Sequence, residues 1–432
     1  MPDSPSPEPL AGPAAAANAP IGRNRQFRLL WVCMLVIGAG NSMLLSVAPP
    51  LVRQMHLADA SVGWIFSLSA LLWVFTSPYW GRLSQSLGRK PVIAFGLLAY
   101  AVSMASFGTG VTLGLNGVLS GSNLFITLVL ARSIFGAFGS ASSPSAQAYI
   151  ADRTSAFERT AQLAGLSSAF AVGQAFSPGL CSWLAGQFGF VFPIWLVAGF
   201  ALAASIAIIS FLPERTAPQS SRQRASFADS LALITDRRLS GYLIYGFALS
   251  IVAGVTVQVF GLFTMDRLNV SGAHGTQFIA AGFMANALAL LATQLIIIPR
   301  LSLSGRAFML WGAALLAVGV ALQVLAVNLE FLLVSQVIQG LGAGLARPGF
   351  TGGASVAVEP HEQGAAAGLV VAANGSGFVF SPIIGGVVYE RLGMNWPLYI
   401  TIALLAAMWV FVFVSRRLRS TPIEAPPETG TP

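Results

Sequence analysis

The sequence predicts an all-α membrane protein that crosses the bilayer twelve times. Hydrophobic residues make up 55% of its 432 residues and charged residues only 9%, whereas a soluble domain carries roughly 25% charged residues. A chain so poor in charge cannot cover a water-exposed surface, so lipid must surround most of it. Two further observations support this prediction: apolar runs of bilayer-spanning length recur along the chain, and the basic residues lie between them.

Twelve mostly apolar runs are long enough to cross a bilayer as helices, which takes about 20 residues. Several contain many Gly, Ser and Ala residues, which are tolerated where helices pack closely on other helices. The fourth, fifth, tenth and eleventh runs are the least apolar, so we expect them to face other helices or a cavity. The runs cover residues 27–52, 61–80, 91–113, 123–146, 160–184, 190–212, 240–264, 273–298, 306–327, 331–353, 363–387 and 395–415.

The arginines predict the orientation of these spans. With both termini placed in the cytoplasm, the inner segments carry most of them and the outer loops carry only Arg53, Arg267 and Arg391. This asymmetry follows the rule that basic residues stay on the cytoplasmic side, and Arg347 near the inner end of the tenth span fits it as well. The arginine-rich, lysine-poor composition and short loops are typical of bacteria, so we expect a multi-pass protein of the cell inner membrane.

An internal repeat divides the membrane part in two. Pro144 aligns with Pro348 at an offset of 204 residues, and the segment 173–178 aligns with 377–382 at the same offset. A parallel duplication of this kind places a binding site between two bundles, near the middle of the bilayer. The predicted organisation is a disordered cytoplasmic tail (1–26), a six-helix bundle (27–212), a cytoplasmic linker (213–239), a second six-helix bundle (240–415) and a second disordered tail (416–432).

A basic turn after the second span carries the first motif. Residues 81–90 read Gly-Arg-Leu-Ser-Gln-Ser-Leu-Gly-Arg-Lys, in which the glycines permit a tight turn and the cations hold it at the inner surface. The segment resembles the loop signature of the major facilitator superfamily, except that Gln85 replaces an acidic residue. The resemblance implies that family's fold and a gating role for this loop together with an acid after the fourth span. The expected gating residues are Gly81, Arg82, Gly88, Arg89, Lys90 and Asp152.

The fourth and fifth spans carry two further motifs of the same family. Arg132 is the only charge well inside a span, and burying an unpaired arginine costs at least about 2.5 kcal/mol. It either bonds to backbone carbonyls of a neighbouring helix, or faces a cavity where it binds an anionic group or takes part in proton coupling. Residues 173–179 resemble the antiporter signature of the drug-efflux branch, and helix kinks are expected at Pro178 and at its repeat partner Pro382.

Polar residues within the spans outline a candidate substrate cavity. Each costs free energy against lipid and should face the bundle interior, either lining a cavity or bonding to another helix. With one cation and no acid deep in a span, the cavity should favour neutral or anionic organic solutes over cationic ones. The expected cavity residues are Arg132, Asn41, Gln174, Gln258 and Asn374.

The chain carries no catalytic or metal-binding spacing of the familiar kinds, such as His-Glu-x-x-His, Gly-x-Ser-x-Gly or Cys-x-x-Cys. We therefore expect neither an enzyme nor a cofactor, and the dispersed basic residues do not indicate nucleic acid. The resemblance implies a secondary transporter that works by alternating access. We expect a lipid-embedded monomer that exports a small organic molecule, such as a drug or a secreted metabolite (siderophores included), in exchange for protons. The alternative is an importer of a small organic anion.

Overall fold

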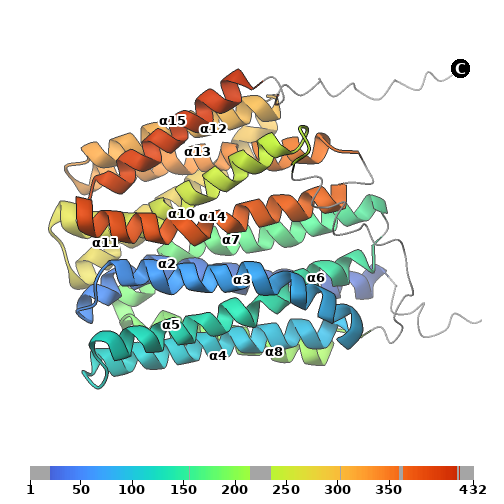
Figure 1. Cartoon of the computed structure of the whole chain (residues 1–432), viewed down its shortest axis with the longest axis horizontal. Coiled ribbons are helices and arrows are strands. Elements are labelled where there is room, and N and C mark those ends of the chain that lie inside the picture. Colours follow the sequence, from blue (N-terminus) through green and yellow to red (C-terminus); the bar gives the residue numbers. More distant parts are fainter. Residues whose placement is uncertain are drawn as a thin grey trace, which may run out of the picture.

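The structure, a computed structural model, describes residues 20–154, 156–214, 235–301, 303–359, 363–415 and 418. All regular elements in these ranges are helical, as the composition predicts. Long helices run back and forth along the longest axis of the molecule (Figure 1). Because a helix satisfies its own backbone hydrogen bonds, this is the arrangement that a chain surrounded by lipid requires.

The first half of the chain makes six crossings. The fourth is interrupted by a short 3₁₀ turn, η1 (Gly139–Ala141), which joins two helices into one crossing. The helices are α2 (Pro20–Gln54), α3 (Ala60–Leu87), α4 (Arg89–Leu115), α5 (Gly121–Ala137) with α6 (Ser142–Ala151), α7 (Ala156–Phe188) and α8 (Val191–Phe211).

The second half makes six more, so the described residues form twelve crossings as expected. Its second crossing continues through a π-helical turn, η2 (Thr293–Ile297), and a 3₁₀ turn, η3 (Ile298–Arg300). The helices are α10 (Ser240–Leu268), α11 (Gly272–Ala292), α12 (Gly305–Leu325), α13 (Leu329–Val356), α14 (Gln363–Leu392) and α15 (Trp396–Val414).

Two of these helices, α7 and α14, lie near the middle of the molecule (Figure 1). The other ten crossings are long and apolar enough to span a membrane on length and composition alone, counted over the described residues. α7 packs on α2 and on α11, and α14 packs on α10 and on α3, so each touches both halves of the chain. In both helices, contact with other helices replaces part of the contact with lipid.

Repeated glycines let these helices approach closely. A Cβ atom on Gly173 of α7 would lie 2.3 Å from the carbonyl oxygen of Leu35 in α2, and one on Gly377 of α14 would lie 2.7 Å from that of Phe247 in α10. Real Cβ atoms do not come so near to an oxygen. The duplicated glycine therefore makes the same kind of helix contact in each half.

Each half has its own apolar core. One cluster of buried side chains runs from Phe27 to Leu212 and the other from Leu239 to Leu418. The predicted domain boundaries stay a prediction, because the 1–26 and 416–432 tails and the 213–239 linker lie largely outside the described residues. Leu239 of the predicted linker and Leu418 of the predicted tail nevertheless pack in the second core.

The predicted turn after the second span needs correcting. α3 continues to Leu87 and α4 begins at Arg89, so Gly81 and Arg82 are helical and the turn consists of Gly88 alone. Gly88 has φ +95°, a conformation that favours glycine. The apolar run ends at residue 80 because polar side chains begin there. The helix itself continues past this point, since polar side chains do not stop a helix.

Replacing Gly173 with alanine should lower the thermal unfolding midpoint of the purified protein. Although alanine normally gains about 1 kcal/mol over glycine within a helix, the new methyl group would force α7 away from α2, and overpacking typically costs about 1–3 kcal/mol. Gly199→Ala in α8 is the matched control, because nothing lies within 4 Å of that Cβ position. Equal midpoints for the two variants would contradict the close contact.

Candidate functional site

Arg132 lies inside the first half, 1% exposed, on α5. Its Nη2 donates a hydrogen bond to Oδ1 of Asn41 on α2. The guanidinium carbon lies 4.4 Å from the ring centroid of Phe135 and 5.2 Å from that of Phe66. The structure thus joins two of the residues predicted for the cavity and places aromatic faces against the cation, an arrangement that contributes about 0.5–2 kcal/mol.

The remaining donors of Arg132 are unsatisfied. Its Nε and Nη1 are buried and have no hydrogen-bond partner among the described residues. Leaving a buried donor unpaired costs about 1–3 kcal/mol. Arg132 donates to no backbone carbonyl in the described part of the chain, but its bond to Asn41 links α5 to α2, so its role as a link between helices and its role in a cavity both stay predictions. Two free donors on a fixed cation are suited to an anionic or carbonyl oxygen.

The other predicted cavity residues lie on the three central helices α7, α10 and α14. Gln174 of α7 and Asn374 of α14 are partly exposed, and the backbone carbonyl of Gln174 accepts a hydrogen bond from Ser42 Oγ at 2.7 Å. Gln258 of α10 is fully buried against α14, where a Cβ on Gly385 would lie 3.3 Å from its Cδ. In this conformation Gln258 fills the contact between two helices. Substrate contact by all three stays a prediction.

The predicted gating residues Arg89 and Asp152 meet. Arg89 Nε donates to Asp152 Oδ2 at 3.0 Å, and its Nη1 donates to Ser84 Oγ at 2.6 Å. Arg82 is exposed and Lys90 partly exposed beside them. The pair joins the turn between α3 and α4 to the end of α6, and its gating role stays a prediction.

Sequence reasoning missed Glu214, which follows α8. Its carboxylate accepts hydrogen bonds from the backbone N–H groups of Arg89 and Lys90 at 3.1 and 2.9 Å, and an anion at a helix N-terminus is stabilising. A Cβ on Gly88 would lie 2.9 Å from Glu214 Oε1, so the glycine is needed for this approach as well as for its φ angle. The sequence offered only the weak signal of an acid just after an apolar run.

The predicted kink positions both lie within continuous helices. Pro178 is inside α7 and position 382 is inside α14. Neither proline ends its helix, and the kinks themselves stay a prediction.

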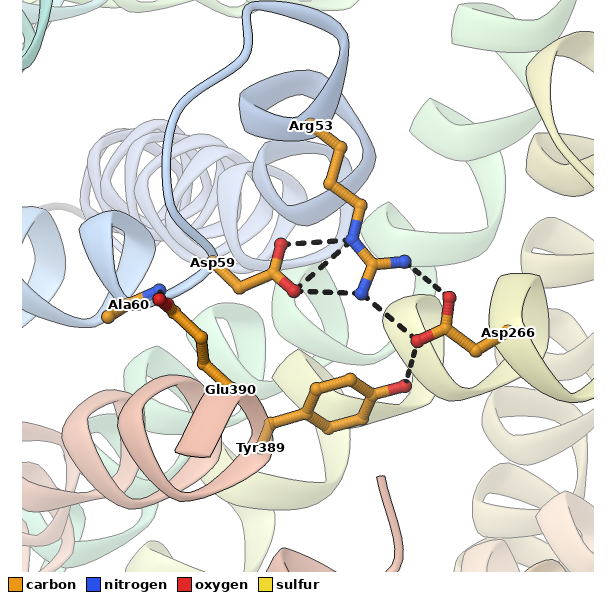
Figure 2. A network of polar contacts seen from close by, with 6 residues as sticks. All are labelled: Arg53, Asp59, Ala60, Asp266, Tyr389 and Glu390. Carbon is orange, nitrogen blue, oxygen red and sulfur yellow. Dashed lines mark hydrogen bonds and ion pairs between the residues drawn. The ribbon is translucent and has the colours of Figure 1, made fainter. Parts of the chain in front are cut away.

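A second polar cluster, also missed from the sequence, joins the two halves (Figure 2). Arg53 at the end of α2 donates to Asp59 through Nε (2.9 Å) and Nη2 (2.8 Å), and to Asp266 of α10 through Nη1 (2.5 Å) and Nη2 (3.0 Å). Tyr389 of α14 donates to Asp266 Oδ2 at 2.6 Å, and the Ala60 N–H donates to Glu390 Oε2 at 2.8 Å. We call Arg53, Asp59, Ala60, Asp266, Tyr389 and Glu390 the Arg53 network.

The Arg53 network lies at the end of the molecule whose loops are predicted to face outward, here called the outer end. Glycines bring the halves together nearby: a Cβ on Gly386 of α14 would lie 3.3 Å from the Asp59 carbonyl oxygen, and one on Gly179 of α7 would lie 3.0 Å from the Met284 nitrogen of α11. At the opposite, inner end, the ion pair of Arg89 with Asp152 lies within the first half. The halves are therefore tied together at the outer end.

Replacing Arg53 with glutamine should loosen the outer end. Exposed ion pairs contribute only about 0.2–1 kcal/mol each. Arg53 is only 28% exposed and forms ion pairs with two carboxylates, so we expect a larger contribution from it. Losing about 1–2 kcal/mol would raise the population with separated halves about 5- to 30-fold. Electron-spin distance measurement between labels at Val118 and Val327, which are 68% and 72% exposed in the outer loops of the two halves, should show a new longer distance.

Arg267→Gln is the matched control for this measurement. Arg267 lies at the same end, but its Nε donates to the Ala326 carbonyl within the second half, at 2.6 Å. If both variants gave the distance distribution of the unmodified protein, the Arg53 network would not be what closes this end.

Comparison with known proteins places the fold and the motifs in a family. The model of the Major Facilitator Superfamily matches residues 30–304 and 283–431. "Multidrug resistance protein 2" of Bacillus subtilis (strain 168) is 26% identical over 382 residues, which cover 86% of this chain and 90% of that protein. The class B tetracycline resistance protein of Escherichia coli is 24% identical over 413 residues, covering 92% and 97%.

Solved structures share the same fold at lower identity. The human organic anion transporter MFSD10 (TETRAN) aligns with a TM-score of 0.63 and 19% identity, covering 90% of this chain and 99% of that one. The nucleoside transporter NupG aligns with a TM-score of 0.65 and 16% identity, covering 91% and 97%. The family model covers nearly the whole membrane part of the chain. The chain therefore belongs to the major facilitator superfamily and is a multi-pass membrane transporter, not an enzyme.

Proposed function

We propose that this protein exports a small organic molecule across the bacterial inner membrane, in exchange for protons and with both termini in the cytoplasm. The observation that carries the proposal is Arg132, a buried cation with two unsatisfied donors inside a transporter fold. A substrate group that accepts hydrogen bonds would satisfy these donors once it reaches them. The direction rests on the similar proteins, whose names are those of drug resistance proteins.

The charges favour a neutral or anionic substrate. Carboxylates of the described residues lie at or beside the ends of helices, not in their middle. Asp59, Asp266 and Glu390 of the Arg53 network are examples. A lipophilic cation would meet Arg132 with no carboxylate beside it, and like charges repel strongly where water is excluded. A drug or a secreted metabolite with a carboxylate, phenolate or carbonyl group fits better.

Transport would proceed by alternating access. The Arg53 network keeps the outer end closed while a substrate enters from the inner side, and the halves then separate at the outer end. One chain supplies both bundles by duplication, so we propose that the monomer, surrounded by lipid, is the working unit. Proton exchange is carried over from the antiporter-like motif in α7 and needs its own test.

Import of a small organic anion is the second candidate. The likeness in fold to a protein titled an organic anion transporter and the cationic character of Arg132 support its substrate class but not its direction. The two candidates share a substrate class and differ in direction.

Direction and coupling can be tested in membrane vesicles. Comparing metabolites inside and outside cells with and without the protein would first identify a transported solute. Inverted vesicles should then accumulate that solute when their lumen is acidified, and a proton ionophore should abolish accumulation. Uptake into right-side-out vesicles, with none into inverted ones, would establish import instead.

Replacing Arg132 with glutamine should reduce the flux of that solute at least about tenfold, because losing one partner of a buried charged hydrogen bond costs about 2–5 kcal/mol. Arg132→Lys should recover part of the flux. Arg391→Gln is the control, since this arginine is exposed at the end of α14. Flux unchanged in Arg132→Gln, at normal protein levels in the membrane, would make Arg132 a structural residue.

A further inference from the structure

A second arginine, Arg347, lies inside a membrane-spanning helix. It follows the start of α13 (Leu329–Val356) by eighteen residues and precedes its end by nine, which places it about 13 Å from the inner end at 1.5 Å per residue. Sequence reasoning interpreted Arg347 as one more cation that fixes the orientation of the chain. The helix face that it occupies decides what it can contact at this depth.

The neighbours of Arg347 show which way this part of α13 faces. Gly344, one turn before, lies against Thr293 in the α11 crossing, and Phe350, one turn after, lies against Gly246 of α10. Ala346 lies against Gly312 of α12, on another side of the helix. Residues three apart share a helix face, so Arg347 occupies the arc of α13 between α10 and α11. These two helices contact α2 and α7 of the first half, so this arc faces the first half.

Arg347 has no polar partner within the described part of the chain. Its backbone carbonyl accepts a hydrogen bond from Thr351, but its guanidinium forms no hydrogen bond or ion pair with a described residue. It is partly exposed, in contrast to Arg132. An unpaired charge at this depth is costly in lipid and is expected to face a water-filled cavity.

The internal repeat does not account for Arg347. Its position in the first half, 204 residues earlier, is Ser143, and the repeat partner of Arg132 is Gln336. The two arginines therefore arose at different positions of the repeat. Counted from the outer ends of their helices, Arg132 is eleven residues deep in α5 and Arg347 eighteen residues deep in α13, a difference of about 10 Å along the membrane normal.

We propose that Arg347 is the first anion-binding residue on the route from the inner end, and that it receives the carboxylate of an organic anion before this reaches Arg132. This rests on the proposed function and narrows its substrates to organic anions. The guanidinium matches a carboxylate through two parallel hydrogen bonds. Two arginines at different depths, each with free donors, give the anion two successive binding positions along the route.

Binding of two related dyes to the purified full-length protein tests this proposal. Fluorescein is an anion with a carboxylate, and rhodamine 6G is a cation with a similar ring system, so charge is their main difference. Fluorescence polarisation should show that the unmodified protein binds fluorescein better than rhodamine 6G. Arg347→Gln should weaken fluorescein binding at least about tenfold, since a hydrogen bond to a charged group contributes about 1.5–3 kcal/mol. Arg347→Lys should restore part of it.

Arg300→Gln is the matched control for this experiment. Arg300 is an exposed cation at the inner end of the neighbouring α11 crossing, so the variant removes the same charge outside the arc that Arg347 occupies. It should bind fluorescein as the unmodified protein does. The thermal unfolding midpoint of each variant monitors folding.

Two results would overturn the proposal: equal fluorescein binding by the unmodified protein and Arg347→Gln, or an unmodified protein that binds rhodamine 6G but not fluorescein. The proposed function and the anion site at Arg347 can fail independently of each other. A protein that binds fluorescein through Arg347 but moves no solute in vesicles is not the proposed exporter, although its anion site stands. Directional flux without a role for Arg347 in binding overturns the anion site alone.

Discussion

The cost of holding a charge within a bilayer is the constraint on which this structure depends. Charged side chains of the described residues lie at the ends of the helices, with Arg132 and Arg347 as the exceptions. Arg132 is held by Asn41 and two aromatic rings, and Arg347 lies on a helix face directed at the other half. Neither has a carboxylate partner among the described residues. Under the proposed function, an anion that visits these cations would offset the cost of holding them within the bilayer.

The same constraint explains the two ends of the molecule. At the outer end Arg53 satisfies its charge with carboxylates from both halves, so its ion pairs also hold the halves together. At the inner end Arg89 pairs with Asp152 of its own half. Between the ends, glycines at Gly173 and Gly377 make tight contacts within each half. Under the proposed alternating access, each half would move as a unit while the contacts between halves change.

Much of this arrangement was predictable from the sequence, since apolar runs, the repeat and the meeting of Arg89 with Asp152 all follow from local pattern or family resemblance. Contacts between the halves were not. Arg53 and Asp266 are 213 residues apart, and no periodicity within one half shows which residue of the other lies opposite. Gln258 looked like a cavity residue, but its surroundings are set by Gly385 on another helix. Gly81 was placed in a turn because hydropathy marks where apolar side chains end, not where a helix ends.

The central claim is that the halves open alternately at the two ends around a cationic route. Spin labels at Leu87 and Leu303, which are 60% and 40% exposed near the inner ends of the two halves, test it most directly in lipid bilayers. When Arg53→Gln releases the outer end, the distance between these labels should shorten, because closing one end accompanies opening the other. An inner distance that stays unchanged while the outer end opens, or that lengthens with it, would contradict alternating access in this protein.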